Sequence, residues 1–276
     1  MSTPPDIVSL VVTLRPQAPV VLSKHLGHAV YALLMRWVDA YDATLAQRWH
    51  DAEALKPFTC SNLVGGHRVE RHTRRFTPEE SCWFRLTTLA PELAAVLTAY
   101  QAQPPETVEL DGHAFYVESV TTDPQVHPWA GTANYEQLAA TYLLAPRGAP
   151  RRLKLEFASP TVFRHQGMHM PFPLPSLTFG SLADRWNAFS PVAISPEARR
   201  YAEQCVAVNN FRLRSAAVPL KDGIWRVGAV GSAHYVAVRY DRYWMAVLAL
   251  LADFGRYGGV GKMTTFGLGQ MRRLEH

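Results

Sequence analysis

The segment Gly258–Gly269, GGVGKMTTFGLG, holds five glycines in twelve residues and ends seven residues before the C-terminus. From Gly259 it has the pattern G-x-G-x5-G-x-G. Glycine adopts positive φ readily and lets a partner approach the backbone closely. Successive backbone N–H groups in such a loop can bind an anion, and Lys262 adds a positive charge. We therefore expect the loop to hold phosphate. The residues expected to contact it are Gly259, Gly261, Lys262, Gly267 and Gly269.

This loop does not match the P-loop of nucleotide-binding proteins. That motif needs G-x4-G-K-[ST] between a strand and a helix. Arg256 stands where the first glycine is required, Met263 follows Lys262, and the pattern before the loop is helical. The competing interpretation is a helix C-cap followed by a tight hairpin. It accounts for Gly258 or Gly259 but leaves the other glycines unexplained.

Composition sets broad limits on the protein class. A chain of 276 residues with 48% hydrophobic residues can form one large domain or two of ordinary size. The formal charge of +5 and the pI of about 9.2 are compatible with a polyanionic partner. The three cysteines form no C-x-x-C pair, so neither a zinc site nor a disulfide framework is indicated. No secretory signal or bilayer-length apolar run is found, so we expect a soluble cytoplasmic protein without a membrane partner.

Hydrophobic patterning in the first half predicts the order β-α-β-β-α-β of a ferredoxin-like unit. The expected elements are a strand at 7–14, a helix capped by Ser23 and running through Val38, a short helix to His50, strands from Phe58 and over 81–89, a helix over 91–101 and a strand over 112–120. Residues 124–148 resemble a connector with a short helix near 134–144.

The second half repeats this order of elements without visible sequence identity to the first. The expected elements are a strand over 151–158, a helix over 177–189, strands over 205–218 and 224–239, a helix capped by Asp241, and a strand over 267–274. The predicted fold class is therefore α+β, with two tandem ferredoxin-like domains. We place an N-terminal domain at residues 1–145 and a C-terminal domain, carrying the glycine-rich loop, at residues 146–276.

Histidine and lysine provide the candidate chemistry. His50 and Lys56 lie six residues apart, at a helix end and in the following loop, where side chains can reach a ligand. Histidine can act as a general base or acid near neutral pH, and lysine can stabilise a developing negative charge. From the residues alone, a His50 that only caps its helix is the favoured interpretation.

The other histidines give no metal signature. His25 and His28 lie three residues apart without an acidic or cysteine partner nearby. His165 and His169 have the spacing of H-E-x-x-H, but glutamate is missing and Gly167 lies between them. We expect neither a catalytic metal nor a cofactor.

A basic cluster over 65–76, GGHRVERHTRRF, is the second candidate for nucleic-acid contact. Its interleaved rings, His67, His72 and Phe76, could stack on unpaired bases. A solvated hairpin tip is the alternative. The arginines expected to contact RNA are Arg68, Arg71, Arg74 and Arg75, and Arg151 and Arg152 add positive charge at the start of the second half.

Three separated stretches resemble the CRISPR-associated endoribonucleases that cut repeat RNA, the Cas-six type of the RAMP superfamily. GVGKMTTFGLGQM looks like the glycine-rich loop of that superfamily. Residues 159–189 resemble the start of its second domain, and residues 25–63 resemble its first helix and the strand that follows. The resemblance covers both halves, in the family's order.

The resemblance implies tandem ferredoxin-like folds and cleavage of CRISPR repeat RNA without a metal. A ribose 2′-OH attacks the adjacent phosphate and leaves a 2′,3′-cyclic phosphate and a 5′-OH. By position, His50 matches the family's catalytic histidine and Lys56 its lysine. Some members use a tyrosine in the first helix, where an ungapped match puts Met35 and Tyr31 lies one turn earlier. Other members place their histidine near the start of that helix, which makes His28, with His25, a further candidate.

A binding protein with the same fold is the alternative function. Such a protein would be a non-catalytic RNA-binding subunit of a CRISPR interference complex. The sequence leaves open which repeat is recognised, whether the RNA must form a hairpin, whether the protein forms a homodimer, and whether it joins other interference-complex subunits.

Overall fold

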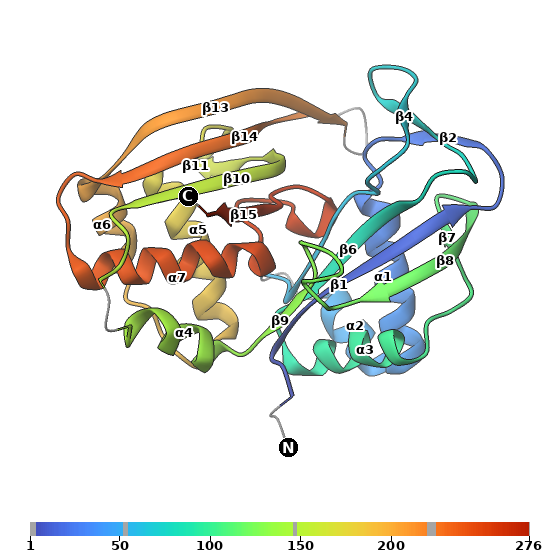
Figure 1. Ribbon diagram of the computed structural model, residues 1–276, viewed down its shortest axis with the longest axis horizontal. Helices are drawn as coiled ribbons and strands as arrows, with labels where there is room; N and C mark the ends of the chain where they lie inside the picture. The colour runs from blue at the N-terminus through green and yellow to red at the C-terminus, as the bar shows by residue number, and fades with distance from the viewer. Residues whose placement is uncertain (1–3, 52–54, 146–147, 220–224, 276) are drawn as a thin grey trace. The chain divides into compact units, whose positions relative to one another are not determined.

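The computed structural model describes residues 4–145, 148–219 and 225–275, except for positions 52–54 and the side chains of positions 50 and 51. The described chain forms two compact units. Unit 1 comprises Met1–Ala133 together with Thr265–Gly267, and unit 2 comprises Asn134–Thr264 and Leu268–His276. The tip of the glycine-rich loop therefore belongs to unit 1, while the rest of the loop belongs to unit 2. In Figure 1 this loop follows the red helix α7 (Arg242–Gly258).

Unit 1 is built on an antiparallel sheet with the strand order β3-β6-β1-β8-β7, and β9 also pairs with β1. The strands of this sheet are β1 (Ile7–Pro16), β3 (Phe58–Cys60), β6 (Cys82–Thr88), β7 (Thr107–Leu110), β8 (His113–Thr121) and β9 (Gly131–Ala133). A smaller sheet joins β2 (Val20–Ser23), β5 (Thr73–Phe76) and β4 (His67–Arg68) in the order β2-β5-β4.

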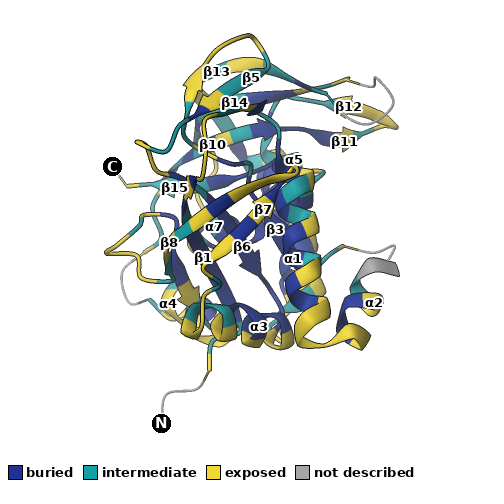
Figure 2. Ribbon diagram, turned by 90° about the vertical axis from the view of Figure 1, so that its right-hand side faces the viewer, coloured by how far each residue is buried: buried dark blue, intermediate teal, exposed yellow. Residues whose placement is uncertain are grey.

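Helices α1 (Gly27–Tyr41) and α3 (Pro91–Ala102) pack on one face of the large sheet, and α2 (Ala43–Asp51) packs against α1. Apolar residues of α1 recur every three or four positions, and this stripe is buried (Figure 2). The buried side chains of α1 are Val30, Leu33, Leu34, Trp37 and Val38. Leu45 and Ala46 of α2 are buried against this core, while four of its seven residues with described side chains are exposed.

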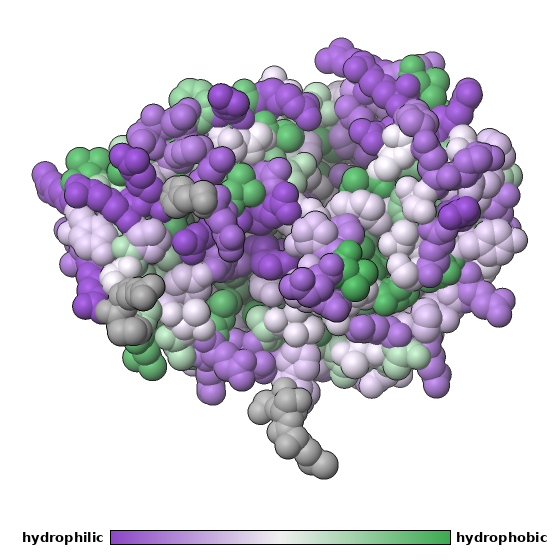
Figure 3. All heavy atoms as spheres, viewed as in Figure 1, coloured by the Kyte–Doolittle hydropathy of each residue, from purple (hydrophilic) through white to green (hydrophobic). Residues whose placement is uncertain are grey.

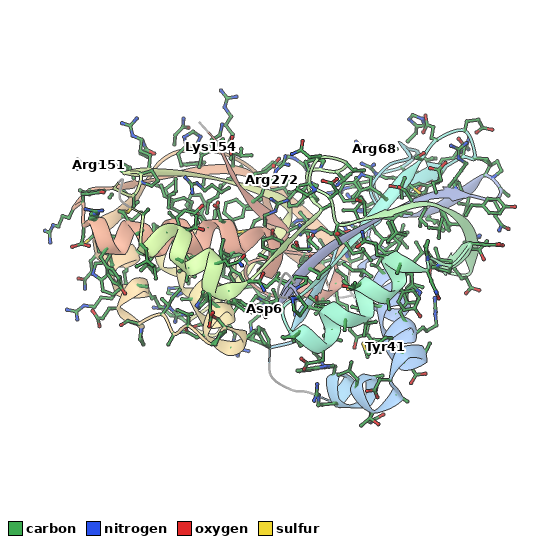
Figure 4. The ribbon with its side chains drawn as sticks, turned by 60° about the horizontal axis from the view of Figure 1, so that its bottom comes forward. Asp6, Tyr41, Arg68, Arg151, Lys154 and Arg272 are labelled. Carbon is green, nitrogen blue, oxygen red and sulfur yellow. The ribbon has the colours of Figure 1, made fainter. Side chains whose placement is uncertain are left out.

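Unit 2 is built on an antiparallel sheet with the order β13-β14-β10-β15. Its strands are β10 (Arg152–Thr161), β13 (Val206–Pro219), β14 (Trp225–Ala237) and β15 (Met271–Leu274), and a hairpin adds β11 (Phe163–His165) and β12 (Met168–Met170). Its helices are α4 (Tyr135–Leu143), α5 (Pro175–Phe189), α6 (Glu197–Cys205) and α7 (Arg242–Gly258). Helices α5 and α7 contact the sheet, and Lys154 and Arg272 project from the side away from α7 (Figure 4).

Both units arrange their four main strands in the same way. Numbered along the chain within each unit, the strands lie in the order second, third, first, fourth, with helical crossovers after the first and third. This is the ferredoxin-like β-α-β-β-α-β arrangement. The predicted fold class of two tandem ferredoxin-like domains is confirmed.

Several local expectations are corrected. Ser23 does not cap the first helix: it ends β2, and its hydroxyl accepts a hydrogen bond from the N–H of His25 at 3.1 Å. The last strand begins at Met271 rather than at position 267, because glycines 267 and 269 adopt positive φ. Pattern reading also missed β7, α6 and the β11–β12 hairpin. The chain passes from unit 1 to unit 2 between Ala133 and Asn134, before α4, and the domains at residues 1–145 and 146–276 stay a prediction.

Candidate active site

The start of α1 gathers several candidate groups within unit 1. The imidazole of His28 is exposed and stacks on the ring of Phe266, with centroids 4.2 Å apart and planes 27° apart. The ring of Tyr31, one turn further along α1, lies 5.1 Å from that of Phe266 and 5.8 Å from that of Phe58. The structure thus brings together His28, Tyr31 and the tip of the glycine-rich loop.

Tyr31 keeps its proton at neutral pH. Burial raises the pKa of its hydroxyl above the ordinary value, and nearby Cys60 adds to this effect. A protonated hydroxyl in this position can donate a hydrogen bond to a phosphate oxygen or to a leaving oxygen. It cannot serve as a base near neutral pH.

His25 does not share the accessibility of His28. Both of its ring nitrogens are buried without a hydrogen-bond partner. Burial lowers the pKa of His25 to about 4, and the charges of Lys24 and His72 act in the same direction. The imidazole is therefore neutral near pH 7, with both ring nitrogens turned away from solvent.

His50 lies in the last turn of α2, and its side chain is outside the described residues. Lys56 is described: its ammonium donates a hydrogen bond to the backbone carbonyl of Trp49, the residue before His50. A cation at a helix C-terminus interacts favourably with the exposed carbonyls there. The structure therefore places the Lys56 charge at the end of the helix that carries His50.

At the base of the glycine-rich loop, four backbone N–H groups donate to acceptors within the protein. Contact of this loop with phosphate stays a prediction. The N–H of Gly261 donates to Ser181 Oγ at 2.8 Å, and that of Lys262 donates to the Val162 carbonyl at 2.8 Å. The N–H groups of Gly259 and Gly269 also donate to backbone carbonyls. Phosphate contact at this base would therefore rest on the exposed side chain of Lys262.

Steric fit explains the glycines of this loop. Gly259, Gly261, Gly267 and Gly269 all have φ between 63° and 87°, a region that other residues rarely adopt. At Gly261 a Cβ would lie 2.4 Å from the Val162 carbonyl oxygen. The glycines thus serve a tightly folded backbone.

The basic cluster forms the predicted hairpin, in strands β4 and β5. Hydrophilic side chains cover its tip (Figure 3), and the side chains of Arg68, Arg71 and Arg75 are exposed. Two members differ from expectation. Arg74 is half-buried and donates to the Gly65 carbonyl at 2.6 Å, and Phe76 is buried in the core, where it cannot stack on a base.

Sequence reasoning missed Asn62 and Phe266. Asn62 follows β3 and joins the start of α1 to the loop tip: its Oδ1 accepts from the Gly27 N–H at 2.9 Å, and its Nδ2 donates to the Gly267 carbonyl at 3.1 Å. Because Asn62 and Gly267 are 205 positions apart, no local pattern signals their contact.

Within the residues that the structure describes, no group of three or more histidine, cysteine, aspartate or glutamate side chains could hold a metal ion. No helix in the same part of the chain combines the length and the apolar character that a membrane span needs.

Comparison with known proteins covers both units. The family model "CRISPR-associated endoribonuclease Cas6" matches residues 155–271, and the model "CRISPR Cas6 N-terminal domain" matches residues 7–140. A CRISPR-associated endoribonuclease Cas6 of Mycobacterium tuberculosis (strain CDC 1551 / Oshkosh) is 34% identical over 129 residues, which are 46% of this chain. That match spans 40% of the length of the relative.

Solved structures match nearly the whole chain. A Cas6 product complex is 27% identical with a TM-score of 0.77, covering 98% of this chain and 99% of the other. Thermus thermophilus Cas6 is 25% identical with a TM-score of 0.74, covering 99% of this chain and all of the other. Both units carry the family's models and its fold, and the chain belongs to the family of the CRISPR-associated endoribonuclease Cas6.

Proposed function

We propose that this protein is an endoribonuclease that cleaves CRISPR repeat RNA into guide units without a metal ion. A ribose 2′-OH loses its proton and attacks the adjacent phosphorus, and the bond from phosphorus to the 5′-oxygen breaks. The 5′-oxygen takes up a proton. The products carry a 2′,3′-cyclic phosphate and a 5′-OH. Family membership supports the reaction class, and the similar product complex shows that a relative has been captured with its product.

His50 is the proposed proton-transfer group, and Lys56 is the proposed stabiliser of the charged transition state. The observation that carries this pairing is the hydrogen bond from the Lys56 ammonium to the carbonyl of Trp49. It holds the positive charge one residue from His50, the position that the resemblance marks as catalytic. A positioned general acid or base typically contributes about 10²–10⁴-fold to a rate.

His28 and Tyr31 are proposed to contact the RNA near the cut. Exposed His28 can donate to or accept from the substrate, and protonated Tyr31 can donate to a phosphate oxygen or to the leaving oxygen. In this assignment the chemistry lies in the N-terminal domain, residues 1–145. The C-terminal domain, residues 146–276, supplies the base of the glycine-rich loop.

Backbone contacts are assigned to exposed cations. Arg68, Arg71 and Arg75 on the hairpin and Lys262 on the loop have exposed side chains that can neutralise phosphates. Arg74 is assigned to holding the hairpin, because its guanidinium is bonded to the Gly65 carbonyl. Phosphate contacts of this kind set the register of the RNA, whereas contacts to unpaired bases set its specificity.

The test uses end-labelled repeat RNA from the protein's own CRISPR array, in EDTA. A matched RNA carries a 2′-deoxy nucleotide on the 5′ side of the cut. We expect wild-type protein to cut only the first RNA, and His50→Ala to lose at least about 100-fold in rate while its affinity stays within about threefold. His28→Ala is assayed beside His50→Ala. If His28→Ala lowers the cleavage rate more than His50→Ala does, the proton-transfer role moves to His28.

Three outcomes would overturn the proposal. Cutting of the deoxy RNA, or cutting that stops in EDTA, would refute the 2′-OH mechanism without metal. Tight binding without any cutting would assign the protein to the non-catalytic RNA-binding subunits.

A further inference from the structure

Asn62 links two backbone segments of unit 1 through both ends of its side-chain amide. Oδ1 accepts from the N–H of Gly27, and Nδ2 donates to the carbonyl of Gly267. Because one partner is a donor and the other an acceptor, these bonds fix the orientation of the amide. The first N–H groups of a helix lack partners within the helix. Asn62 supplies one for α1, whose own preceding residues make no side-chain cap.

The two linked segments lie in direct backbone contact. A Cβ on Gly27 would lie 2.1 Å from the Phe266 carbonyl oxygen and 2.6 Å from the Gly267 nitrogen. A Cβ on Gly267 would lie 2.6 Å from Asn62 Oδ1, and Gly267 has φ of 87°. Each contact requires glycine, so Gly27, Asn62 and Gly267 form one fitted unit, which we call the Asn62 clamp.

The clamp determines where the ring of Phe266 lies. Phe266 precedes Gly267, and His28 follows Gly27, so the clamped backbone segments carry the two stacked rings. Stacking on Phe266 restricts the orientation of the exposed His28 side chain. We propose that Asn62 is a positioning residue for RNA cleavage: by clamping the loop tip to α1 it holds Phe266 against His28 and so orients the His28 imidazole toward the RNA.

This inference rests on the proposed function and adds a role for the loop tip. The tip would orient a side chain of α1 instead of binding phosphate through N–H groups. Losing the clamp should leave RNA affinity nearly unchanged, because exposed arginines and lysine supply the backbone contacts. It should lower the rate of the bound complex, because displacement of a reacting group by about 1 Å can cost about 100-fold.

Asn187 offers a matched control. Its amide makes the same pair of bonds in unit 2: Oδ1 accepts from the Ile194 N–H and Nδ2 donates to the Ile194 carbonyl, both at 2.7 Å. Asn62→Ala and Asn187→Ala each remove two side-chain hydrogen bonds, so we expect similar downward shifts of the melting temperature. Only Asn62→Ala should disturb His28.

The first readout is the NMR spectrum of the His28 ring in the full chain, without RNA. A ring stacked on Phe266 has its proton resonances shifted upfield, and Phe266→Ala gives the unstacked reference. We expect Asn62→Ala to move the His28 resonances toward that reference and Asn187→Ala to leave them in place. His28 resonances in Asn62→Ala that match the wild type would overturn the clamp, whether or not the protein cuts RNA.

The second readout is the single-turnover rate at saturating protein. We expect Asn62→Ala to lose about tenfold with little change in affinity, and the double variant Asn62→Ala/His28→Ala to be no slower than His28→Ala. Asn187→Ala should cut at the wild-type rate. If Asn62→Ala slows the His28→Ala protein as much as it slows the wild type, Asn62 does not act through His28. A wild type that fails to cut refutes the proposed function, and the NMR readout then still decides the clamp.

Discussion

The helices α1 and α5 occupy the same place in the two ferredoxin-like units, and each has fifteen residues. They begin differently. Helix α5 starts with Pro175, which has no N–H to satisfy and suits the first helical turn. Helix α1 starts with Gly27, whose N–H needs Asn62 and whose missing side chain leaves room for the backbone of Phe266.

The residues along the two helices continue this contrast. On α5, Thr178 hydrogen-bonds the Tyr235 hydroxyl at 3.1 Å, and Ser181 accepts from the Gly261 N–H. These side chains stabilise unit 2 from within. On α1, His28 is exposed, and half-buried Tyr31 lies near the loop tip. The same topology is thus used in two ways. The start of α5 completes the core of unit 2, whereas the start of α1 presents the candidate reactive groups of unit 1.

The largest expected effect on the cleavage rate comes from replacing a glycine by alanine in each of the two helices. In Gly27→Ala the new Cβ meets backbone atoms that cannot swing away. In Gly180→Ala it meets Arg199 Nε, the far part of an exposed side chain. We expect Gly27→Ala to lower the cleavage rate about 100-fold and stability by about 1–3 kcal/mol. Gly180→Ala should cut at the wild-type rate.

Thermal melts and far-UV circular dichroism would accompany the rate measurements. Gly180→Ala weakens only an exposed ion pair between Arg199 and Asp184, worth about 0–1 kcal/mol, and gains about 1 kcal/mol in helix propensity. Wild-type cutting by a folded Gly27→Ala protein would show that the loop tip does not need its close approach to α1.

The contrast also shows what the sequence could predict. The order of strands and helices along the chain follows from hydrophobic spacing, which is local, and the cap at Asp241 is read from adjacent residues. The Asn62 clamp joins residues 205 positions apart, so no window of sequence contains it. Residue type alone marks His28 and Lys56 as candidates, but it does not indicate Phe266 and Trp49, which contact them.

The sequence also does not show which side chains of a short strand point into the core. Arg74, Arg75 and Phe76 follow one another in β5, yet one side chain is half-buried, one is exposed and one is in the core. A charge run does not show which members turn inward. The glycines show a related limit, because positive φ permits both an anion-binding loop and a loop that bonds to its own protein. The N–H groups of Gly259, Gly261 and Gly269 donate to protein acceptors, which the glycine spacing alone does not reveal.

The segments that precede α1 and α5 should contribute differently to the loss of stability in acid. His25, before α1, has a pKa lowered to about 4, whereas the segment Pro171–Pro175 before α5 has no titratable side chain. Between pH 4 and the unfolded value near 6.5, the unfolded chain binds more protons at His25 than the folded chain. Stability should therefore fall as pH drops through this window, by about 1–2 kcal/mol, because solvent reaches part of this half-buried residue and screens its interactions.

Urea titrations at pH 7 and pH 5 would measure this loss. The charged groups that act on His25 are Lys24 and His72, whose own pKa is lowered by desolvation and by nearby cations. We expect His25→Phe to flatten the pH dependence and His113→Phe, at an exposed position, to leave it unchanged. A His25→Phe protein with the full acid loss would assign the effect to another group.

The smallest expected effect compares two helix caps. Asp42 Oδ1 accepts from the N–H groups of Thr44 and Leu45 at the start of α2, and Asp241 Oδ1 accepts from the Trp244 N–H at the start of α7. Loss of either cap should cost about 1 kcal/mol. The consequences should differ: α7 is seventeen residues long and largely buried, while α2 is nine residues long, largely exposed, and carries His50.

We therefore expect Asp42→Ala to lower the cleavage rate about threefold to tenfold, because a frayed α2 holds His50 less firmly, and Asp241→Ala to leave it unchanged. Asp42→Ser keeps a cap acceptor and should recover most of the rate. Equal rate losses in Asp42→Ala and Asp241→Ala would mean that cutting tracks overall stability. A loss confined to Asp42→Ala would tie the reaction to α2, and with it to His50, through a substitution that touches neither the histidine nor the RNA.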